Sequence, residues 1–252
     1  TELGVLRTDE NANLNRVQAV LNNQEHLRKA RIHPIDVLKA LKTYQSGGRL
    51  GRSQKNWNPV PRIVDILEKA VELSFEVVEP TGKTFMHAVD ISGSMSSLVA
   101  DVGLSCCEIA TTMALVTAKA ETNYMIRGFS TEFGDLGITA KDSFSSAIYK
   151  ANKHNFGGTD ASAAYDWMID HKFKADVVCF WTDSESWAGY KHPSQVLAEY
   201  RQRVNRNIKA VYVTLAPYRI TLVDPKDPLS WDLAGFDPGT PRVIQMLATG
   251  EL

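Results

Sequence analysis

The sequence predicts an α/β protein with a doubly wound, mostly parallel sheet, helices on both faces, and a few α-helices in front of it. Apolar runs of strand length alternate with stretches of helical spacing after residue 83, a pattern typical of parallel strands joined by helices. One of these runs, 176–182, is almost continuously apolar, as a strand buried on both faces requires. Residues 1–58 show only helical stripes. With 44% hydrophobic and 23% charged residues, the composition is that of an ordinary globular protein.

The amino-terminal part is expected to be helical. Apolar stripes predict helices over 13–21, from Pro34 to the stop at Ser46-Gly47-Gly48, and over 63–75. Residues 49–61 contain two prolines and no periodicity, so we interpret them as a linker. This segment contains Arg49, Arg52, Lys55 and Trp57, which could contact phosphates and a stacked base. We favour the alternative that the segment is a solvated linker. We place the domain boundary between residues 58 and 59.

The remaining elements follow in order. Strands are predicted over 84–89, 123–129, 176–182 and 208–215, the last of these being the last clear strand. A long, nearly uncharged stretch predicts one buried central helix over 95–120. Further helices are expected over 142–152, 160–169, 193–205 and 241–247, and a short turn over 231–235.

Charge and cysteine content exclude several classes of protein. The net charge is −1, but residues 1–60 carry +5 and residues 61–252 carry −6; a basic helical surface and a functional patch explain this equally well. Three cysteines, too few for a disulfide framework, are expected to be buried thiols in a reducing, cytoplasmic setting. No apolar run is long enough for a membrane span. The chain starts at Thr1, not Met, and we expect it to be a fragment of a longer protein.

A loop rich in oxygen ligands follows the first predicted strand. It places Asp90, Ser92 and Ser94 at alternate positions, one carboxylate and two hydroxyls. Such hard oxygens suit Mg²⁺ or Mn²⁺ and suit zinc or copper poorly. Taken alone the pattern is common, and a strand end with a helix N-cap explains it as well.

Two other loops are expected at the same edge of the sheet. Thr159 follows Gly157-Gly158, and Asp183 follows the apolar strand that ends at Thr182. Loops after parallel strands converge at one edge, so we expect a divalent-cation site with a coordination position open to water or an outside ligand. Its predicted ligands are Asp90, Ser92, Ser94, Thr159 and Asp183, whereas Asp160 and Glu185 are expected to cap a helix or act indirectly.

These motifs resemble the metal-ion-dependent adhesion site of von Willebrand factor A domains. The wider sequence resembles the Ro/SS-A (TROVE-domain) ribonucleoprotein autoantigen family. The similarity is carried by His33-Pro34-Ile35, Ala40-Leu41-Lys42-Thr43-Tyr44, Val78-Glu79-Pro80-Thr81-Gly82-Lys83, His192-Pro193, Glu199-Tyr200-Arg201 and Gly235-Phe236-Asp237. It extends over nearly the whole chain from Leu14 onward.

The resemblance implies a particular organisation and function. Residues 1–58 would be the last helices of a HEAT-like (TROVE) ring with a linker, and residues 59–252 a von Willebrand factor A domain. The family binds small non-coding Y RNAs and the ends of misfolded RNAs, mainly through the ring, most of which this chain lacks. The metal-site residues carry over to this chain, and no individual RNA-contacting residue does. Ser184 stands where relatives often have Asn.

We therefore expect a binding protein and not an enzyme. No nucleotide-binding glycine loop is present, and Ser92 stands where a two-Asp phosphatase would need its second carboxylate. The open coordination position would accept an oxygen of an acidic protein ligand or a phosphate. The alternative is a metal-dependent protein–protein interaction module that does not contact RNA. We interpret His87 as a core histidine, Trp181 as a packing residue and His192 as a helix start.

Overall fold

The computed structural model describes residues 12–30, 32, 34–47, 57–74, 79–99, 103–154, 157–183, 189–215, 222–235, 237 and 239–252. The chain divides into two compact units, Thr1–Glu76 and Val77–Leu252. This division falls later than the boundary expected after residue 58, because the helix over 61–74 packs with the helices that precede it. Among the described residues, no helix combines the length and the apolar character needed to cross a membrane.

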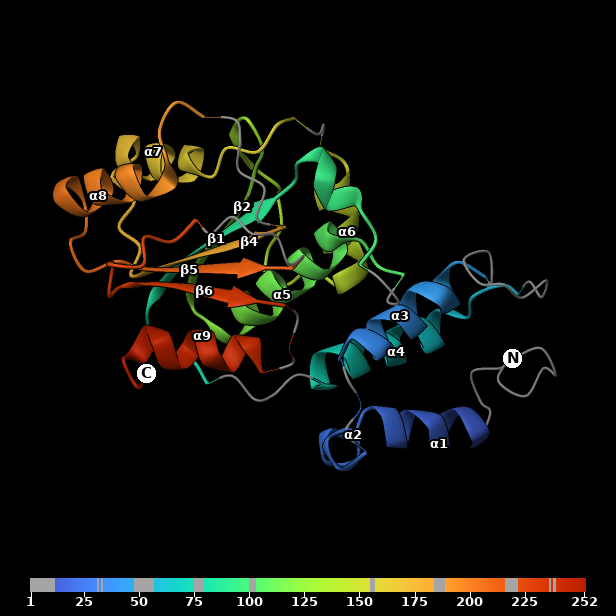
Figure 1. Ribbon diagram of the computed structural model, residues 1–252. Helices are drawn as coiled ribbons and strands as arrows, with labels where there is room; N and C mark the ends of the chain where they lie inside the picture. Colours follow the sequence, from blue (N-terminus) through green and yellow to red (C-terminus); the bar gives the residue numbers. More distant parts are fainter. Residues whose placement is uncertain are drawn as a thin grey trace. The chain divides into compact units, whose positions relative to one another are not determined.

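The first unit is helical, as the sequence predicts (Figure 1). A short helix over residues 24–29 was not predicted, because six residues are too few to show a periodic stripe. In the first unit, a buried apolar cluster is formed by Leu14, Ile63 and Ile66. Its helices are α1 (Ala12–Leu21), α2 (Gln24–Lys29), α3 (Pro34–Gln45) and α4 (Pro61–Ser74).

The segment before α4 is fixed to the end of α3. The Trp57 backbone N–H donates to the Gly47 carbonyl at 3.2 Å, and the Trp57 Nε1–H donates to the Tyr44 carbonyl at 2.9 Å. The two rings stack with centroids 6.1 Å apart. Trp57 therefore packs within the unit, while the predicted basic positions beside it, Arg49, Arg52 and Lys55, lie outside the described residues.

The second unit is built on a six-stranded sheet in the order β3-β2-β1-β4-β5-β6. All pairs are parallel except β2 with β3. This order and direction of the strands confirm the predicted doubly wound, mostly parallel sheet. The central strand β1 is buried along almost its whole length. The strands are β1 (Thr84–Asp90), β2 (Asn123–Phe129), β3 (Phe133–Asp135), β4 (Val177–Thr182), β5 (Lys209–Thr214) and β6 (Ser230–Ala234).

Two strands at the sheet edges were not predicted. The antiparallel strand β3 has three residues, two of them exposed, so it carries no apolar pattern. The turn expected over 231–235 is wrong, because residues 230–234 form the parallel edge strand β6 beside β5. Only its first residue is buried, so the sequence lacks the apolar run of an inner strand.

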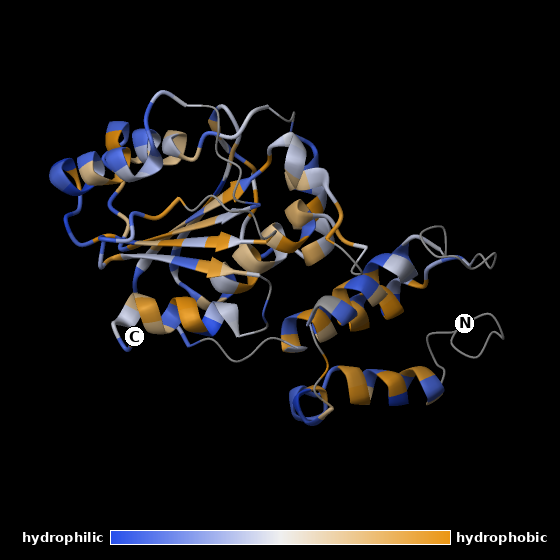
Figure 2. Cartoon of the chain, viewed as in Figure 1, coloured by the Kyte–Doolittle hydropathy of each residue, from blue (hydrophilic) through white to orange (hydrophobic). Residues whose placement is uncertain are grey.

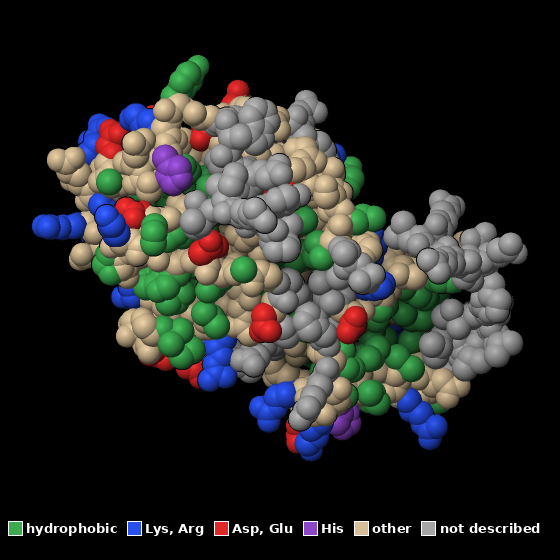
Figure 3. Space-filling view, in the orientation of Figure 1, with side chains coloured by type: hydrophobic (Ala, Val, Ile, Leu, Met, Phe, Trp, Pro, Cys, Tyr) green, Lys and Arg blue, Asp and Glu red, His purple; other side chains and the backbone are tan. Residues whose placement is uncertain are grey.

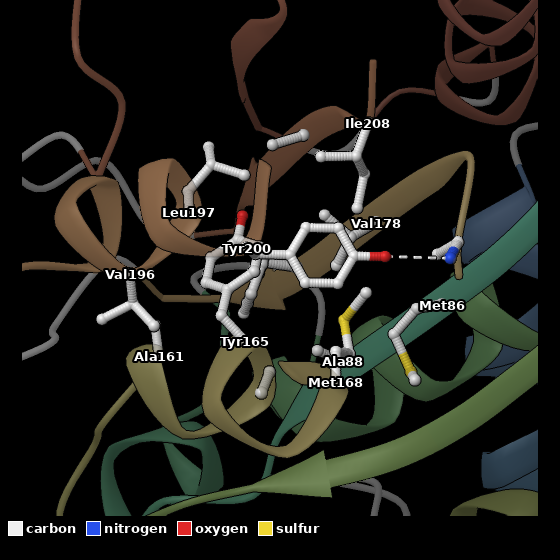
Figure 4. Close-up of a cluster of buried hydrophobic side chains, with 14 of the residues drawn as sticks. Met86, Ala88, Ala161, Tyr165, Met168, Val178, Val196, Leu197, Tyr200 and Ile208 are labelled. Carbon is white, nitrogen blue, oxygen red and sulfur yellow. Dashed lines mark hydrogen bonds between the residues drawn. The ribbon is translucent and has the colours of Figure 1, made fainter. Parts of the chain in front are cut away.

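Helices cover both faces of the sheet (Figure 1). Strands β1, β4 and β5 supply one face of a core in which α7 and α8 pack, with Tyr165, Met168 and Tyr200 among its large side chains (Figure 4). Helices α5 and α9 pack against strands of the same sheet from the other side, and α6 packs on α5. Figure 2 shows apolar residues along the strands between these layers and hydrophilic residues on α8. The helices are α5 (Cys106–Ala120), α6 (Phe144–Asn152), α7 (Ser162–Asp170), α8 (Pro193–Arg203) and α9 (Thr240–Thr249).

The single helix predicted over 95–120 is wrong. The chain forms a short 3₁₀ helix, η1 (Gly93–Ser96), then pairs Leu98 with Ser105, and only then starts α5. Ser105 begins α5 with a capping box: its hydroxyl accepts from the Glu108 N–H, and its own N–H donates to the Glu108 carboxylate at 2.8 Å. This capping box sets the start of α5 at Cys106, so the helix cannot extend back to residue 95.

Candidate metal centre at the carboxyl edge of the sheet

Asp90 is the last residue of β1, and its side chain is fully buried. Its Oδ1 accepts from the Ser92 N–H at 2.8 Å, and its Oδ2 accepts from the Thr182 hydroxyl at 2.7 Å. The Ser92 and Ser94 hydroxyl oxygens lie 3.1 Å apart in the loop that follows. The structure therefore gathers the carboxylate and both hydroxyls of this loop around one point at the end of the central strand.

Asp183 directly follows β4, next to β1 in the sheet, and its side chain is 2% exposed. Burial is the main cause that raises the pKa of Asp90 and of the Cys106 thiol; the Asp183 charge adds to both effects, and the Asp90 charge adds to the effect on Cys106. The pairing of β4 with β1 brings the two acids to the same end of the sheet.

Thr159 belongs to the loop before α7, and it is also 2% exposed. The loop is tied to the end of β2 by the Asp160 N–H, which donates to the Ser130 carbonyl at 2.7 Å. A side chain at Gly157 would meet the Thr131 hydroxyl at 2.9 Å, so glycine permits this close approach. Since β2 pairs with β1 up to Phe129 opposite Asp90, Thr159 is held near the same edge as the other predicted ligands.

Burial raises the pKa of Asp90 to about 7, although hydrogen bonds from Ser92 and Thr182 act in the opposite direction. A buried carboxylate beside a second one is costly to ionise, and a cation between them offsets that cost. Among the described residues no group of three or more His, Cys, Asp or Glu forms, so a cation here would depend on hydroxyls and water beside the two acids. Two carboxylates with three hydroxyls suit Mg²⁺ or Mn²⁺, so the donor set fits a hard divalent cation.

The neighbouring polar residues have structural roles. Asp160 Oδ1 accepts from the N–H and the hydroxyl of Ser162, at the start of α7. His192 caps α8, where its ring and backbone make a capping box with Gln195. His87 is fully buried and accepts from Trp181 Nε1 at 3.3 Å, as expected of a core histidine and a packing tryptophan. Glu185 and Ser184 lie outside the described residues.

Thr182 is the contributor that the sequence analysis missed. Its register explains its position: Val89 lies opposite Trp181, so the next residues, Asp90 and Thr182, share one face of the sheet. Asp90 and Thr182 each end an apolar strand, and this is visible in the sequence. To predict that they meet, however, the relative register of the two strands would have to be known. All three cysteines are buried free thiols, as predicted.

The comparisons with known proteins agree with this architecture. A family model described as the Ro60 vWA domain matches residues 84–248. The chain is 36% identical to the RNA-binding protein RO60 of Deinococcus radiodurans, over 99% of this chain and 47% of that protein. It is 33% identical to the RNA-binding protein RO60 of Caenorhabditis elegans, over 92% of this chain and 36% of that protein.

A solved structure matches over the whole chain. The crystal structure of the Deinococcus radiodurans RO (RSR) protein superposes with a TM-score of 0.76 and 37% identity, covering 100% of this chain and 51% of that one. The chain thus spans about half the length, or less, of these relatives. With the family model covering most of the second unit, this chain belongs to the Ro60 vWA domain family.

Proposed function

We propose that this chain binds a divalent cation, Mg²⁺ or Mn²⁺, and uses it to hold an acidic oxygen of a partner. The observation that carries the proposal is the buried Asp90 carboxylate, hydrogen-bonded to Thr182 and next to Asp183. Ser92, Ser94 and Thr159 supply neutral oxygens, so the two acids would balance the charge of one divalent ion. The ion would supply Lewis acidity at an open coordination position.

The residues of the chain provide orientation and exclusion of water. Thr182 and the Ser92 N–H fix both oxygens of Asp90, and a carboxylate retains further lone pairs for a cation or for water bound to it. Burial of Asp90, Thr159 and Asp183 lowers the local dielectric, which strengthens attraction to a cation. We propose binding and not catalysis, because this arrangement offers no nucleophile with a paired base.

Removal of the Asp90 carboxylate tests the cation site. Asp90→Ala is expected to abolish Mn²⁺ binding in titration calorimetry while the folded far-UV spectrum persists. Asp170→Ala removes an exposed acid of the same unit and serves as the matched control. Unchanged Mn²⁺ affinity in Asp90→Ala would overturn the site.

We further propose that the chain takes part in RNA binding, as the names of its relatives suggest for them. Gel-shift assays over a salt series test this, because contacts with phosphates weaken as salt rises. Loss of the shift on replacing Arg49, Arg52 and Lys55 together would favour contact through that segment. No shift at low salt would favour the metal-dependent protein-interaction module instead.

A further inference from the structure

The edge of the sheet opposite the candidate metal centre is rich in positive charge. Residues 171–176 precede β4 and residues 201–209 lead into β5; together they carry six Lys or Arg and a single Asp. Residues 61–252 as a whole carry 18 Lys or Arg against 24 Asp or Glu, so this concentration runs against the local charge balance. Figure 3 shows Lys and Arg side chains, interspersed with Asp and Glu, on the side of the molecule where α7 and α8 lie.

Half of these six cations are free to meet an outside anion. Arg201 pairs with Asp227 at 2.6 Å, Lys209 donates to the carbonyls of Leu247 and Ala248 at the end of α9, and Arg203 pairs with Glu199. The remaining three are exposed and form no ion pair within the described part of the chain. We call these three residues the basic edge: Lys172, Lys174 and Arg206.

Hydrogen bonds fix the two backbone segments that carry the basic edge. The Tyr200 hydroxyl accepts from the Ala175 N–H at 3.1 Å (Figure 4). It also donates to the Phe173 carbonyl at 2.8 Å. Asn205 Nδ2 donates to the Ala175 carbonyl at 2.7 Å. These bonds hold the turn after α7 beside the end of α8, so the backbone positions that carry the cations of the two segments are fixed relative to each other.

Lys172 occupies a backbone position that favours glycine. Its φ is 49°, the only positive φ of a non-glycine residue in the described ranges. It follows the C-cap His171 in a Schellman arrangement, where the Phe173 N–H donates to the Met168 carbonyl at 2.9 Å. The Schellman arrangement accounts for this left-handed backbone, and it leaves the exposed Lys172 side chain at the end of α7 next to His171 in the sequence.

An aromatic column adjoins the basic edge. The exposed His171 ring stacks on Trp167 with centroids 4.1 Å apart and planes at 18°. The Arg127 guanidinium also lies over the Trp167 ring, 4.3 Å from its centroid, and it lies over Phe133 as well. Since Trp167 already has these partners, the outer face of His171 is the surface that remains for a further ring.

We propose that the basic edge and His171 bind single-stranded RNA, with phosphates on the three cations and a base stacked on His171. Cations beside a flat exposed ring are the means by which proteins hold single strands. An acidic protein segment would use the cations but would have no need of the ring. The inference rests on the RNA-binding part of the proposed function and is independent of the metal centre.

Charge reversal at two positions tests the phosphate contacts. The whole chain is titrated against a short fluorescein-labelled oligoadenylate in EDTA, followed by anisotropy. Lys174→Glu with Arg206→Glu is expected to weaken binding at least tenfold and to reduce the salt slope by about 1.4, since each single-strand contact contributes about 0.7. The matched control is Lys141→Glu with Lys153→Glu, two exposed cations elsewhere in the same unit.

Replacement of the ring distinguishes RNA from other polyanions. His171→Ala is expected to weaken oligoadenylate binding about tenfold, leave heparin binding unchanged, and be rescued by His171→Phe. Unfolding midpoints of all variants show whether each remains folded.

Three results would overturn the inference. The first is equal weakening by the basic-edge pair and its control. The second is a His171→Ala variant that affects RNA and heparin alike. If the parent chain binds no RNA at all, the RNA part of the proposed function fails together with the inference; if it binds but the variants behave like the control, only the inference fails.

Discussion

The Thr182 hydroxyl at the end of β4 donates a 2.7 Å hydrogen bond to Oδ2 of Asp90 at the end of β1. The bond joins two neighbouring strands at the point where both enter their loops. It fixes the rotation of the Asp90 carboxyl group, and it opposes the rise in the pKa of Asp90 that burial causes. Thr182 is therefore a positioning residue for the candidate metal centre.

Thr182→Val keeps the shape of the side chain and removes its hydroxyl. We expect the Mn²⁺ affinity to fall about tenfold, the scale on which loss of a group that orients a ligand acts. Thr182→Ser retains the donor and is expected to stay close to the parent. Titration calorimetry measures both, and a valine variant that binds Mn²⁺ like the parent would reduce Thr182 to a packing role.

His87 makes stability depend on pH. Burial lowers its pKa from 6.5 to about 3, so between these values the unfolded chain binds a proton that the folded chain does not. The contribution of His87 to the free energy of unfolding is therefore fully present above pH 6.5. As the pH falls from 6.5 towards 3, this contribution is lost by up to about 1.4 kcal/mol per pH unit.

His87→Gln keeps an acceptor for Trp181 but does not titrate. Urea denaturation from pH 7.5 to pH 4.5 should therefore show a shallower loss of stability in the variant than in the parent. Asp90 has a raised pKa, so its protonation stabilises the folded state as the pH falls, opposite to the effect of His87. Both proteins retain Asp90, so the difference between their pH profiles reports His87 alone. Parallel pH profiles would contradict the prediction.

Lys172→Gly relieves the left-handed backbone at the end of α7. We expect the free energy of unfolding to rise by about 1 kcal/mol, since a side chain in this conformation is strained by roughly that amount. Binding of oligoadenylate should weaken in the same variant, because a cation is lost. Lys174→Gly removes a cation from a position without that strain, and a similar gain in stability there would argue against the explanation.

Ser105→Ala breaks the capping box of α5. The cost is expected to be about 1 kcal/mol, because the buried first turn loses the acceptor of the Glu108 N–H. Glu108→Gln retains an acceptor for the Ser105 N–H and should cost less. Chemical denaturation compares the two; equal stability of Ser105→Ala and the parent would show that other contacts set the start of α5.

The sequence predicted the inner strands well and the edges poorly. Strands β1, β4 and β5 carry apolar runs because helices cover both their faces, whereas β2 buries only part of its length. The edge strands β3 and β6 leave most of their residues partly exposed, so their sequences resemble turns. The helix expected over 95–120 failed for a different reason: residues 96–98 are exposed and leave the helical conformation after η1, and only the capping box marks the start of α5.

At the candidate site, too, the sequence predicted the residues at the ends of apolar strands but not the contacts between strands and loops. The positions of Asp90 and Asp183 at one edge were predictable because Asp90 ends one apolar strand, Asp183 directly follows another, and parallel strands end at one edge. The hydrogen bond from Thr182 and the anchoring of the Thr159 loop by Ser130 depend on register and loop conformation. The basic edge was beyond prediction, because its two segments lie about thirty positions apart in sequence, as the hydrogen bond from Asn205 to Ala175 shows.

The bond between Asp90 and Thr182 spans 92 positions of the chain. Contacts of such long range close a long loop at a cost in conformational entropy, and they slow the folding of parallel sheets. Both oxygens of Asp90 are thus held in place only once β4 has docked beside β1. In a refolding experiment, the recovery of tight Mn²⁺ binding would consequently report the arrival of β4, later than the formation of the helices.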